Sequence, residues 1–170
     1  MTFRPKTRTG KEKAISIIGA VFSIILFALS GVVTYYKFAY QITALLLAVV
    51  AVEIYMKYVA SDYVYDANES VFRVYRVNGK KSICVCSLDY NGSVTKVIRS
   101  SEFEAHKKDY PKFNFCVNYC KNLFPKDYYV YMFEFNGKRS LMKFEPDEIF
   151  VGYLNSAVGE ALKNKNNENH

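Results

Sequence analysis

The cysteines are the residues with the most obvious chemical potential, and they occur as two close pairs, Cys84 with Cys86 and Cys116 with Cys120. Zinc sites favour cysteine pairs whose spacing lets the chain bend around the ion. On an extended strand, Cys84 and Cys86 would share one face with their sulfurs about 6–7 Å apart. That separation is too large for tight tetrahedral binding without a bulge. We therefore expect small, buried apolar side chains here, with metal or redox roles as the alternatives.

A second group of reactive side chains lies in Glu102–Asp109, where the sequence EFEAHKKD brings together two glutamates, a histidine and an aspartate. His106 is the only histidine outside the C-terminal tail, so it is the one sensible general base. No second ligand motif accompanies this segment, and no glycine-rich phosphate loop, nucleophile elbow or HExxH motif occurs. We predict a solvated loop, no cofactor, no metal and no enzymatic activity. Catalysis by this loop is the alternative.

Glu53 is an acidic residue within a long apolar stretch, and it has two interpretations. A carboxylate inside a bilayer could carry protons or cations. Alternatively, Glu53 lies near the end of a span, where it could reach the interface or pair with Lys57 four residues later on a helix. We favour the second interpretation, because one acidic residue makes no conduction path.

The elements that must position these residues begin with the apolar stretches themselves. Residues 14–34 carry no charge, and a helix of that length extends about 31 Å, close to the hydrocarbon thickness of a bilayer. A second apolar stretch, Phe38–Met56, follows an aromatic connection. We predict a two-helix transmembrane hairpin over residues 14–60, with a cleaved segment plus one span as the alternative. Small residues should pack the helices together, namely Ser16, Gly19 and Ser23 against Ala44, Ala48 and Ala51.

The charge distribution predicts the orientation of this hairpin. The chain has 23 Lys and Arg against 16 Asp and Glu, and much of the excess precedes the first span. By the positive-inside rule, residues 1–13 form a basic cytoplasmic N-terminus. A short hairpin returns the chain to the same side, so we expect a multi-pass protein of the cell membrane with both termini in the cytoplasm. The remainder is closer to neutral, which argues against nucleic-acid binding.

From Ser61 the pattern changes to short alternating runs. Residues 71–77 alternate with period two, which is typical of a strand. Asn-Gly pairs at 78–79, 91–92 and 136–137 predict type I′ hairpin turns. Phe113–Leu123 fits either a strand or a helix. An apolar stripe predicts an amphipathic helix from Pro146 to Lys163, followed by a disordered polar tail at 164–170.

These elements predict a fold class with two parts: a membrane α-helical hairpin plus an α+β domain at residues 61–163. The domain should be an antiparallel bent sheet or partly open barrel, capped by the C-terminal helix. The segment VFRVYRVNGKKSICVCSLDYNGSVTKV (71–97) resembles the first hairpins of bacterial pleckstrin-homology-like domains, and FEPDEIFVGYL (144–154) is similar to their capping helix. Over about residues 14–160 the chain also resembles a poorly characterised family of small two-span membrane proteins of Gram-positive bacteria.

The resemblance implies the fold and the topology, but little about activity. Phosphoinositide-binding members carry spaced basic residues around the first hairpin; Lys80 and Lys81 lie there without the full pattern, so headgroup recognition is not implied. We expect a non-catalytic, membrane-anchored domain that presents a cytoplasmic protein- or membrane-binding surface to a protein partner. The alternative is an accessory subunit of a transporter or envelope complex, bound through the hairpin. The residues expected at the membrane surface are Arg4, Lys6, Arg8, Lys11, Lys13, Lys80 and Lys81.

Overall fold

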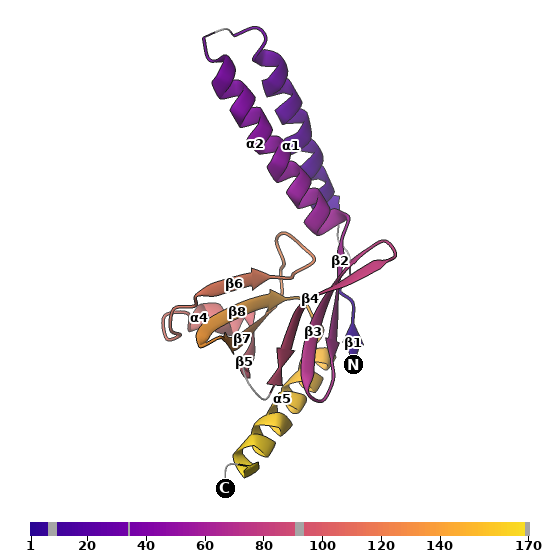
Figure 1. The fold of residues 1–170 in the computed structure, drawn as a ribbon, viewed down its shortest axis with the longest axis vertical. Helices are drawn as coiled ribbons and strands as arrows, with labels where there is room; N and C mark the ends of the chain where they lie inside the picture. The colour runs from indigo at the N-terminus through magenta and orange to yellow at the C-terminus, as the bar shows by residue number, and fades with distance from the viewer. Residues whose placement is uncertain (7–9, 34, 91–93, 169–170) are drawn as a thin grey trace. The chain divides into compact units, whose positions relative to one another are not determined.

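The chain forms two units in a computed structural model that describes residues 1–6, 10–33, 35–90 and 94–168. One unit, here called the helical unit, is Thr7–Asp62. The other, the sheet unit, combines Met1–Lys6 with Tyr63–His170. Figure 1 shows the helices of the first unit and the sheets and C-terminal helix of the second.

The helical unit consists of two long antiparallel helices (Figure 1). Helix α1 is Gly10–Leu29, helix α2 is Lys37–Ile54, and a π-helical turn η1, Tyr55–Val59, continues α2. Their mean hydropathies are 2.0 and 1.9, so both are long and apolar enough to cross a membrane by length and composition. In the most apolar 18-residue stretch of each helix, only 17% is buried within the protein. A core helix of a water-soluble domain would be mostly covered, whereas these helices expose their apolar sides.

Helix α1 ends five residues before the predicted boundary at Thr34. The Ser30 hydroxyl donates to the Phe27 carbonyl oxygen at 2.6 Å, and the amides of Gly31 and Val32 bond to carbonyls only three residues back. Such tightening is a common way of closing a helix end.

The packing between α1 and α2 follows the small residues that the sequence indicates. Ser16 Oγ donates to the Ala51 carbonyl oxygen at 2.9 Å, and Ser23 Oγ donates to the Ala44 carbonyl oxygen at 2.7 Å. A Cβ atom placed on Gly19 would lie 3.3 Å from Ala51 Cβ. The predicted close approach of the two backbones is therefore confirmed.

The sheet unit contains two four-stranded sheets. The first sheet has the order β1-β2-β3-β4, formed by Thr2–Phe3, Asp62–Ala67, Val71–Asn78 and Lys81–Asp89. The second has the order β5-β7-β8-β6, formed by Val94–Arg99, Tyr129–Phe135, Lys138–Phe144 and Phe115–Asn118. A short helix α4, Ser100–Ala105, follows β5, and α5, Glu148–Glu168, ends the described chain. An apolar helical hairpin followed by sheets and a C-terminal helix is confirmed.

The second sheet differs from the predicted antiparallel arrangement in one pairing. The segment left open between strand and helix contains a strand, β6, which pairs with β8 in parallel, so the sheet is not entirely antiparallel. In the chain, β6 and β8 are separated by residues 119–137, which include β7, so a long crossover joins these two neighbours. Parallel neighbours require such a crossover, which hairpin signals cannot indicate.

The strand β1 was not predicted at all. Thr2 and Phe3 pair with Asp66 and Tyr65 of β2, and Thr2 Oγ1 donates to Asp66 Oδ1 at 2.8 Å. The Phe3 ring stacks on Tyr65 at 6.3 Å and lies 5.9 Å from the Phe150 ring. The first residues of the predicted basic N-terminus therefore belong to the sheet unit, because Phe3 completes its aromatic core.

The turns test the Asn-Gly prediction. Asn136 and Gly137 have φ of 52° and 70°, and they join the paired residues Phe135 and Lys138, so the predicted type I′ turn is confirmed. The type I′ prediction at Asn78–Gly79 is wrong. Asn78 still pairs with Lys81, and only Gly79 has a positive φ, of 59°, the pattern of a type II′ turn over Gly79–Lys80. The pair at 91–92 lies outside the described residues.

The main core is an aromatic cluster between the two sheets and α5. Phe72 stacks on Tyr131 at 5.4 Å, and Tyr65, Phe144 and Phe150 are fully buried beside them. The predicted apolar stripe of α5 is confirmed, because its buried residues recur at helical spacing, namely Phe150, Val151, Leu154, Ala157, Val158 and Ala161. A smaller cluster on the other face of the second sheet contains Ile98, Phe103, Val130, Met132 and Leu141.

The boundaries of α5 are shifted from the predicted 146–163. The helix begins at Glu148, and Asp147 caps it by accepting the Phe150 amide at 2.8 Å. It continues to Glu168, into the segment predicted as a disordered tail, since residues 160–168 contain no proline or glycine that would end it. Residues 169–170 lie outside the described chain.

Candidate functional site

The candidate site is one end of the first sheet, and the strand register defines it. The turn Asn68–Ser70 is held by the Asn68 side chain, which accepts the Val71 amide at 2.7 Å, so β2 and β3 run antiparallel. At one end of β3, Asn78 pairs with Lys81 across the β3–β4 turn; at the other, Val71 pairs with Asp89. The end with the β3–β4 turn is also where β2 begins. We call it the junction end, because there the chain connects to the helical unit.

The junction end is strongly basic. Lys80 and Lys81 lie at the β3–β4 turn, and Arg76 lies two residues before the end of β3. Since β1 is antiparallel to β2, Arg4 and Lys6 follow Phe3 toward the beginning of β2. All five basic residues are exposed. One acidic residue, Asp62, lies at the same end.

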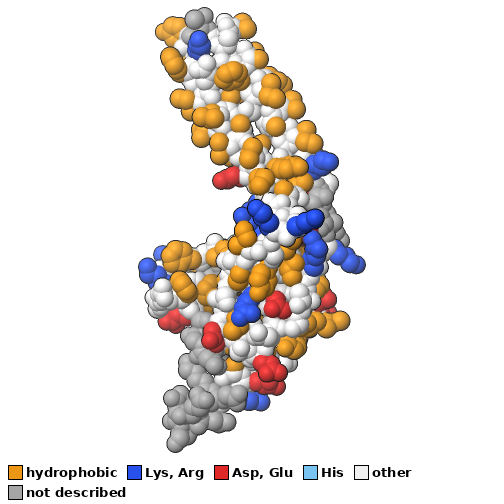
Figure 2. Space-filling model, turned by 45° about the vertical axis from the view of Figure 1, so that its right-hand side comes forward, with side chains coloured by type: hydrophobic (Ala, Val, Ile, Leu, Met, Phe, Trp, Pro, Cys, Tyr) orange, Lys and Arg blue, Asp and Glu red, His pale blue; other side chains and the backbone are white. Residues whose placement is uncertain are grey.

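The opposite end of the same sheet is acidic. Asp66 lies near the end of β2, Glu69 lies in the β2–β3 turn, and Asp89 ends β4 opposite Val71. In Figure 2, Lys and Arg side chains gather toward one end of the sheet unit on the face in view, and Asp and Glu side chains lie further from it. The first sheet is therefore electrically polarised along its strands, and its basic end can attract an anionic surface.

Four of the seven basic residues predicted from the sequence meet at this end, namely Arg4, Lys6, Lys80 and Lys81. Lys11 and Lys13 lie instead in the first turn of α1, exposed on the helical unit, with buried Glu12 between them. Arg8 lies outside the described residues. Sequence reasoning missed Arg76, although pairing β3 with β4 around the predicted turn would have placed it beside the two lysines.

The cysteines are arranged differently from the expectation. Cys86 pairs with Val74 and Cys84 with Tyr75, which leaves Val85 as the extra residue of a β-bulge. The expectation of buried thiols is wrong for Cys84 and Cys116, which are exposed on edge strands; Cys120 is buried. Burial, with Cys84 nearby, raises the pKa of the Cys86 thiol to about 11. Among the described residues, no group of three or more His, Cys, Asp or Glu could hold a metal ion.

A network of tyrosine and backbone hydrogen bonds fixes the segment after β6 between the two sheets. The Tyr119 hydroxyl donates to the carbonyl oxygen of the bulged Val85 at 3.1 Å, and burial raises its pKa to about 12. The Tyr65 hydroxyl donates to the Tyr119 carbonyl at 2.9 Å and accepts the Glu145 amide at 3.2 Å. Burial also raises the Tyr65 pKa. These hydroxyls stay protonated at neutral pH, and they act as structural donors.

Glu145, which precedes α5, extends this network to Asn122 through its side-chain carboxylate. It accepts both the backbone amide and the side-chain amide of Asn122, each at 2.9 Å. Next to Asn122, Lys121 is only 2% exposed, an unusual burial for a lysine that the sequence analysis did not anticipate. Its neighbours in the sequence include the polar residues Asn118 and Asn122, so local composition gave no warning of burial.

The acidic and histidine-containing segment 102–109 is only partly a loop. Residues through Ala105 belong to α4, and the remainder forms turns. His106 Nδ1 lies 3.2 Å from Asp109 Oδ2, and Lys107 Nζ lies 3.1 Å from Glu104 Oε2, all on exposed side chains. The structure thus brings these residues together only as local surface pairs.

Glu53 is exposed on α2, close to the end of the apolar stretch. The π-helical turn η1 begins two residues later, so an α-helical i,i+4 alignment with Lys57 does not hold. Lys57 Nζ lies instead 5.3 Å from the centre of the Tyr58 ring. Within the described chain, no ion pair joins Glu53 to Lys57.

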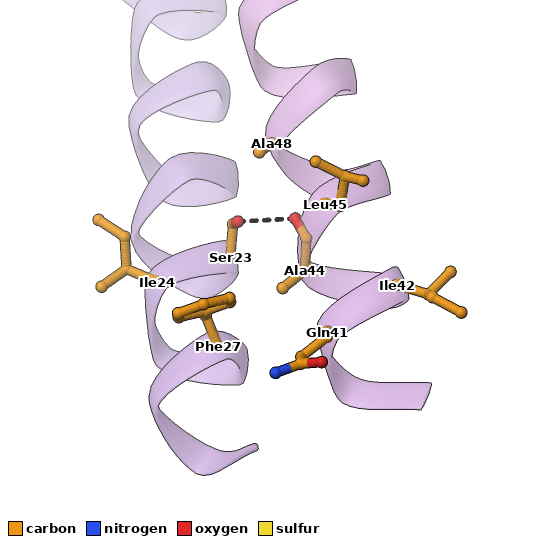
Figure 3. A pocket seen from close by; sticks show the side chains of 8 residues that line it. All are labelled: Ser23, Ile24, Phe27, Gln41, Ile42, Ala44, Leu45 and Ala48. Atoms are coloured by element: carbon orange, nitrogen blue, oxygen red, sulfur yellow. Dashed lines mark hydrogen bonds between the residues drawn. The ribbon is translucent and has the colours of Figure 1, made fainter. Parts of the chain in front are cut away.

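A hollow of about 570 Å³ lies between α1 and α2 near their connection. Figure 3 shows Ser23, bonded to Ala44, at its centre and the Gln41 side chain reaching toward α1. The other lining side chains are apolar, including Ile24, Phe27 and Leu45. The hollow is therefore an apolar groove with the side-chain amide of Gln41 at its rim.

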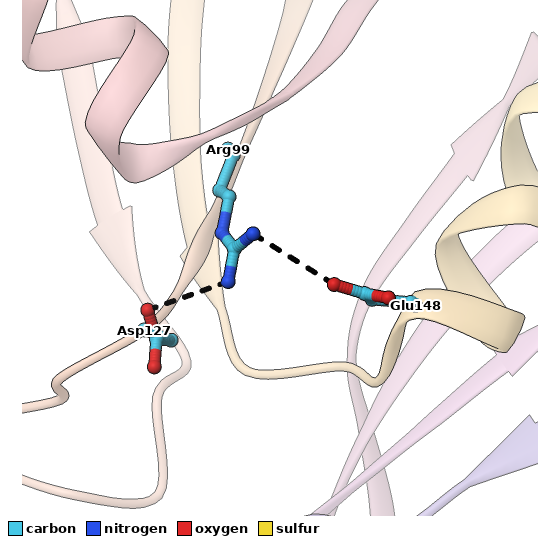
Figure 4. Close-up of polar contacts among 3 residues, drawn as sticks. All are labelled: Arg99, Asp127 and Glu148. Atoms are coloured by element: carbon cyan, nitrogen blue, oxygen red, sulfur yellow. Dashed lines mark ion pairs between the residues drawn. The ribbon is translucent and has the colours of Figure 1, made fainter.

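A small ion-pair cluster links β5 to α5. Arg99 lies 3.6 Å from the Asp127 carboxylate and 3.7 Å from that of Glu148 (Figure 4). All three side chains are at least half exposed. Water screens such pairs, so the cluster contributes little to stability and marks no buried reactive centre.

Comparison with known proteins gave no match to a family model, a curated protein or a solved structure. The activity must therefore be inferred from the residues of this chain. Two features carry that inference: the exposed apolar helices and the polarised first sheet.

Proposed function

We propose that the protein is a membrane-anchored, non-catalytic module. Helices α1 and α2 span the cell membrane as a hairpin and hold the sheet unit on its cytoplasmic face, where that unit contacts anionic lipid and binds a protein partner. Length, hydropathy and exposed apolar sides of both helices support the anchor. The basic residues before α1 favour the cytoplasmic orientation.

The polarised first sheet is the observation that carries the proposal. Only Ala60 and Ser61 connect η1 to β2, and two residues extend about 7 Å at most. The beginning of β2, which belongs to the junction end, is therefore tied to the end of the hairpin by a very short connection. Each basic side chain near an anionic lipid surface contributes about 1 kcal/mol. Such contributions can come from Arg4, Arg76, Lys80 and Lys81. The acidic residues of the first sheet lie at the opposite end of its strands.

Strand β1 supports the hairpin topology over a cleaved leader. It precedes α1, yet it pairs with β2, which follows α2. The segments before and after the hairpin consequently belong to the same folded unit. Cleavage after α1 would remove β1, and with it Phe3, from the core of the sheet unit. An uncleaved hairpin keeps both.

The sheet unit is proposed to be pleckstrin-homology-like. Two sheets that enclose one aromatic core, with α5 packed against it, support this resemblance; the parallel pairing of β6 with β8 departs from a simple antiparallel arrangement. Tethering raises the effective concentration of such a domain toward membrane partners. A weak surface can then suffice for partner binding.

Charge reversal tests the proposed lipid contact in the full chain, reconstituted into nanodiscs. We expect hydrogen exchange of the β3–β4 turn to slow in anionic lipid relative to zwitterionic lipid, and the triple variant Arg76→Glu, Lys80→Glu, Lys81→Glu to abolish the difference. The matched control reverses three exposed lysines elsewhere, at Lys108, Lys112 and Lys126. Equal exchange of the wild-type turn in both lipids would contradict the proposal.

The second candidate function is an accessory subunit of a transporter or envelope complex. The groove near Gln41 favours it, because an amide at the rim of an apolar groove can bond to a neighbouring helix. Gln41→Leu should then dissociate a complex purified in mild detergent, while Thr43→Leu, at an exposed polar position outside the groove, should not. If the wild-type protein purifies in mild detergent without a partner, the accessory-subunit function is excluded.

A further inference from the structure

The apolar face of the second sheet extends beyond its packed core. Alternate residues of β7 point to one face, and Tyr131 and Phe133 are buried there in the main core. Phe135 is next in the same row, yet it is 56% exposed. The row therefore runs past the core toward the β7–β8 turn, where the described chain does not cover it.

A second exposed ring lies on the same face. Phe115 of β6 pairs with Ser140 of β8, and Lys138 lies two residues before Ser140, so these residues share one face. Phe115 is 53% exposed, and Lys138 Nζ lies 5.9 Å from the centre of its ring. Lys138 also pairs with Phe135 across the turn. We call Phe115, Phe135 and Lys138 the aromatic tip.

The turn that carries the aromatic tip is well defined. The type I′ conformation at Asn136–Gly137 fixes where the two strands end. Arg139 is exposed on the opposite face of β8, where it pairs with Glu134. Among the described residues, Lys138 is thus the charged side chain that shares the face of Phe115 and Phe135, beside two rings that water solvates poorly.

We infer that the aromatic tip is a second membrane-contact site, which places Phe115 and Phe135 at the headgroup–acyl boundary of an anionic bilayer and Lys138 at the phosphates. Aromatic and cationic side chains at one extremity match that boundary, because the rings enter the apolar layer while the ammonium group stays at the surface. The inference rests on the proposed function, since the anchor keeps a bilayer within reach. A soluble protein partner is the competing occupant.

Single-tryptophan variants of the full chain test the inference without background, because the sequence contains no tryptophan. Phe115→Trp and Phe135→Trp are each reconstituted into anionic lipid vesicles whose lipids carry brominated acyl chains, which quench nearby indoles. We expect blue-shifted, quenched emission from both. Ile149→Trp, on an exposed position of α5, is the matched control and should remain unquenched. Lys138→Glu should remove most of the quenching of Phe115→Trp.

A fourth reporter separates this inference from the anchor itself. Phe22 lies exposed on α1, and Phe22→Trp should be quenched wherever the hairpin is embedded. Quenching of Phe22→Trp without quenching at either tip position overturns the tip inference and leaves the anchor intact. Unquenched Phe22→Trp refutes the anchor. Equal quenching at the tip and at Ile149→Trp shows general adsorption to the bilayer and overturns the specific site. Cross-linking of the aromatic tip to a protein, without quenching, also overturns the inference and shows that the occupant is a protein partner.

Discussion

Ser16 donates its hydroxyl to the backbone carbonyl oxygen of Ala51 at 2.9 Å, from one long helix to the other. A short serine side chain of α1 thus reaches the backbone of α2 directly. It can do so only because the two helix backbones lie close together. Ser23 repeats the arrangement toward the other end of the pair, with Gly19 between them. Individual bonds of this kind contribute about 0.6 kcal/mol in membranes. Helix association in lipid also depends on the packing contacts that this close approach allows.

Gly19→Leu should therefore separate the helices. A Cβ at Gly19 already lies 3.3 Å from Ala51 Cβ, and overpacking of this kind typically costs about 1–3 kcal/mol. Ala20→Leu adds a similar volume at an exposed position and should have little effect. Thermal unfolding of both variants in detergent measures the difference. Equal behaviour would show that the small-residue contact does not hold the hairpin together.

Tyr131→Phe should leave stability unchanged or raise it by about 1 kcal/mol. Among the described residues, the buried Tyr131 hydroxyl has no hydrogen-bond partner, so its removal relieves an unsatisfied group. Tyr65→Phe is the informative contrast, since that hydroxyl both donates and accepts. We expect it to cost about 1–3 kcal/mol in chemical denaturation. A larger loss for Tyr131→Phe than for Tyr65→Phe would contradict the hydrogen-bond assignment.

The thiols should react in the order of their exposure. We expect alkylation of Cys84 and Cys116 at neutral pH, slow alkylation of Cys86, and protection of Cys120 until unfolding. Peptide mass spectrometry of timed reactions reads all four. Because burial raises the pKa of Cys86 to about 11, its rate should continue to rise with pH up to that value. Rapid alkylation of Cys120 in the folded protein would show that the core differs from the one described.

The same pKa predicts a loss of stability at high pH. An unfolded thiol has a pKa of about 8.5, so between about pH 9 and pH 11 the folded state keeps a proton that the unfolded state has lost. The free energy of unfolding therefore falls across that window. Cys86→Ala should reduce the slope between about pH 9 and pH 10, below the range in which the buried tyrosines titrate, whereas Cys84→Ala should leave that slope unchanged. Denaturation measured at pH 8, 9.5 and 11 compares the three proteins.

Arg99→Ala should change stability by less than about 0.5 kcal/mol, although Arg99 contacts two carboxylates. Phe150→Ala, in the core that α5 covers, should cost about 3–5 kcal/mol. The adjacent, exposed Ile149→Ala serves as the matched control. An Arg99→Ala loss above 2 kcal/mol would mean that the ion-pair cluster is shielded from water.

Local patterns predicted much of this fold, because they depend on neighbours in the sequence. The apolar lengths indicated both long helices, the spacing of Ser16, Gly19 and Ser23 indicated the contacting side of α1, and Asn136–Gly137 indicated its turn. The misses are non-local. Strand β1 depends on a free edge more than sixty residues away, and the parallel pairing of β6 depends on a crossover. Neither leaves a periodic signal in its own few residues.

The candidate site was partly predictable for the same reason. Counting charges was enough to single out Arg4, Lys6, Lys80 and Lys81. Only the register of β2, β3 and β4 shows that these residues share one end with Arg76, and that Asp66 and Asp89 lie at the other. The bulge at Val85, which exposes Cys84, likewise depends on pairing with β3. Spacing alone had suggested a regular strand.

The pairing of Thr2 and Phe3 with β2 sets an order of events during synthesis. These residues leave the ribosome before either long helix, but their partners Asp66 and Tyr65 emerge after both. Phe3 can therefore settle beside Phe150 only after α5 has also emerged. Strand β1 thus precedes both long helices in the chain but joins its sheet after them, and any factor that holds this segment during elongation would delay completion of the sheet unit.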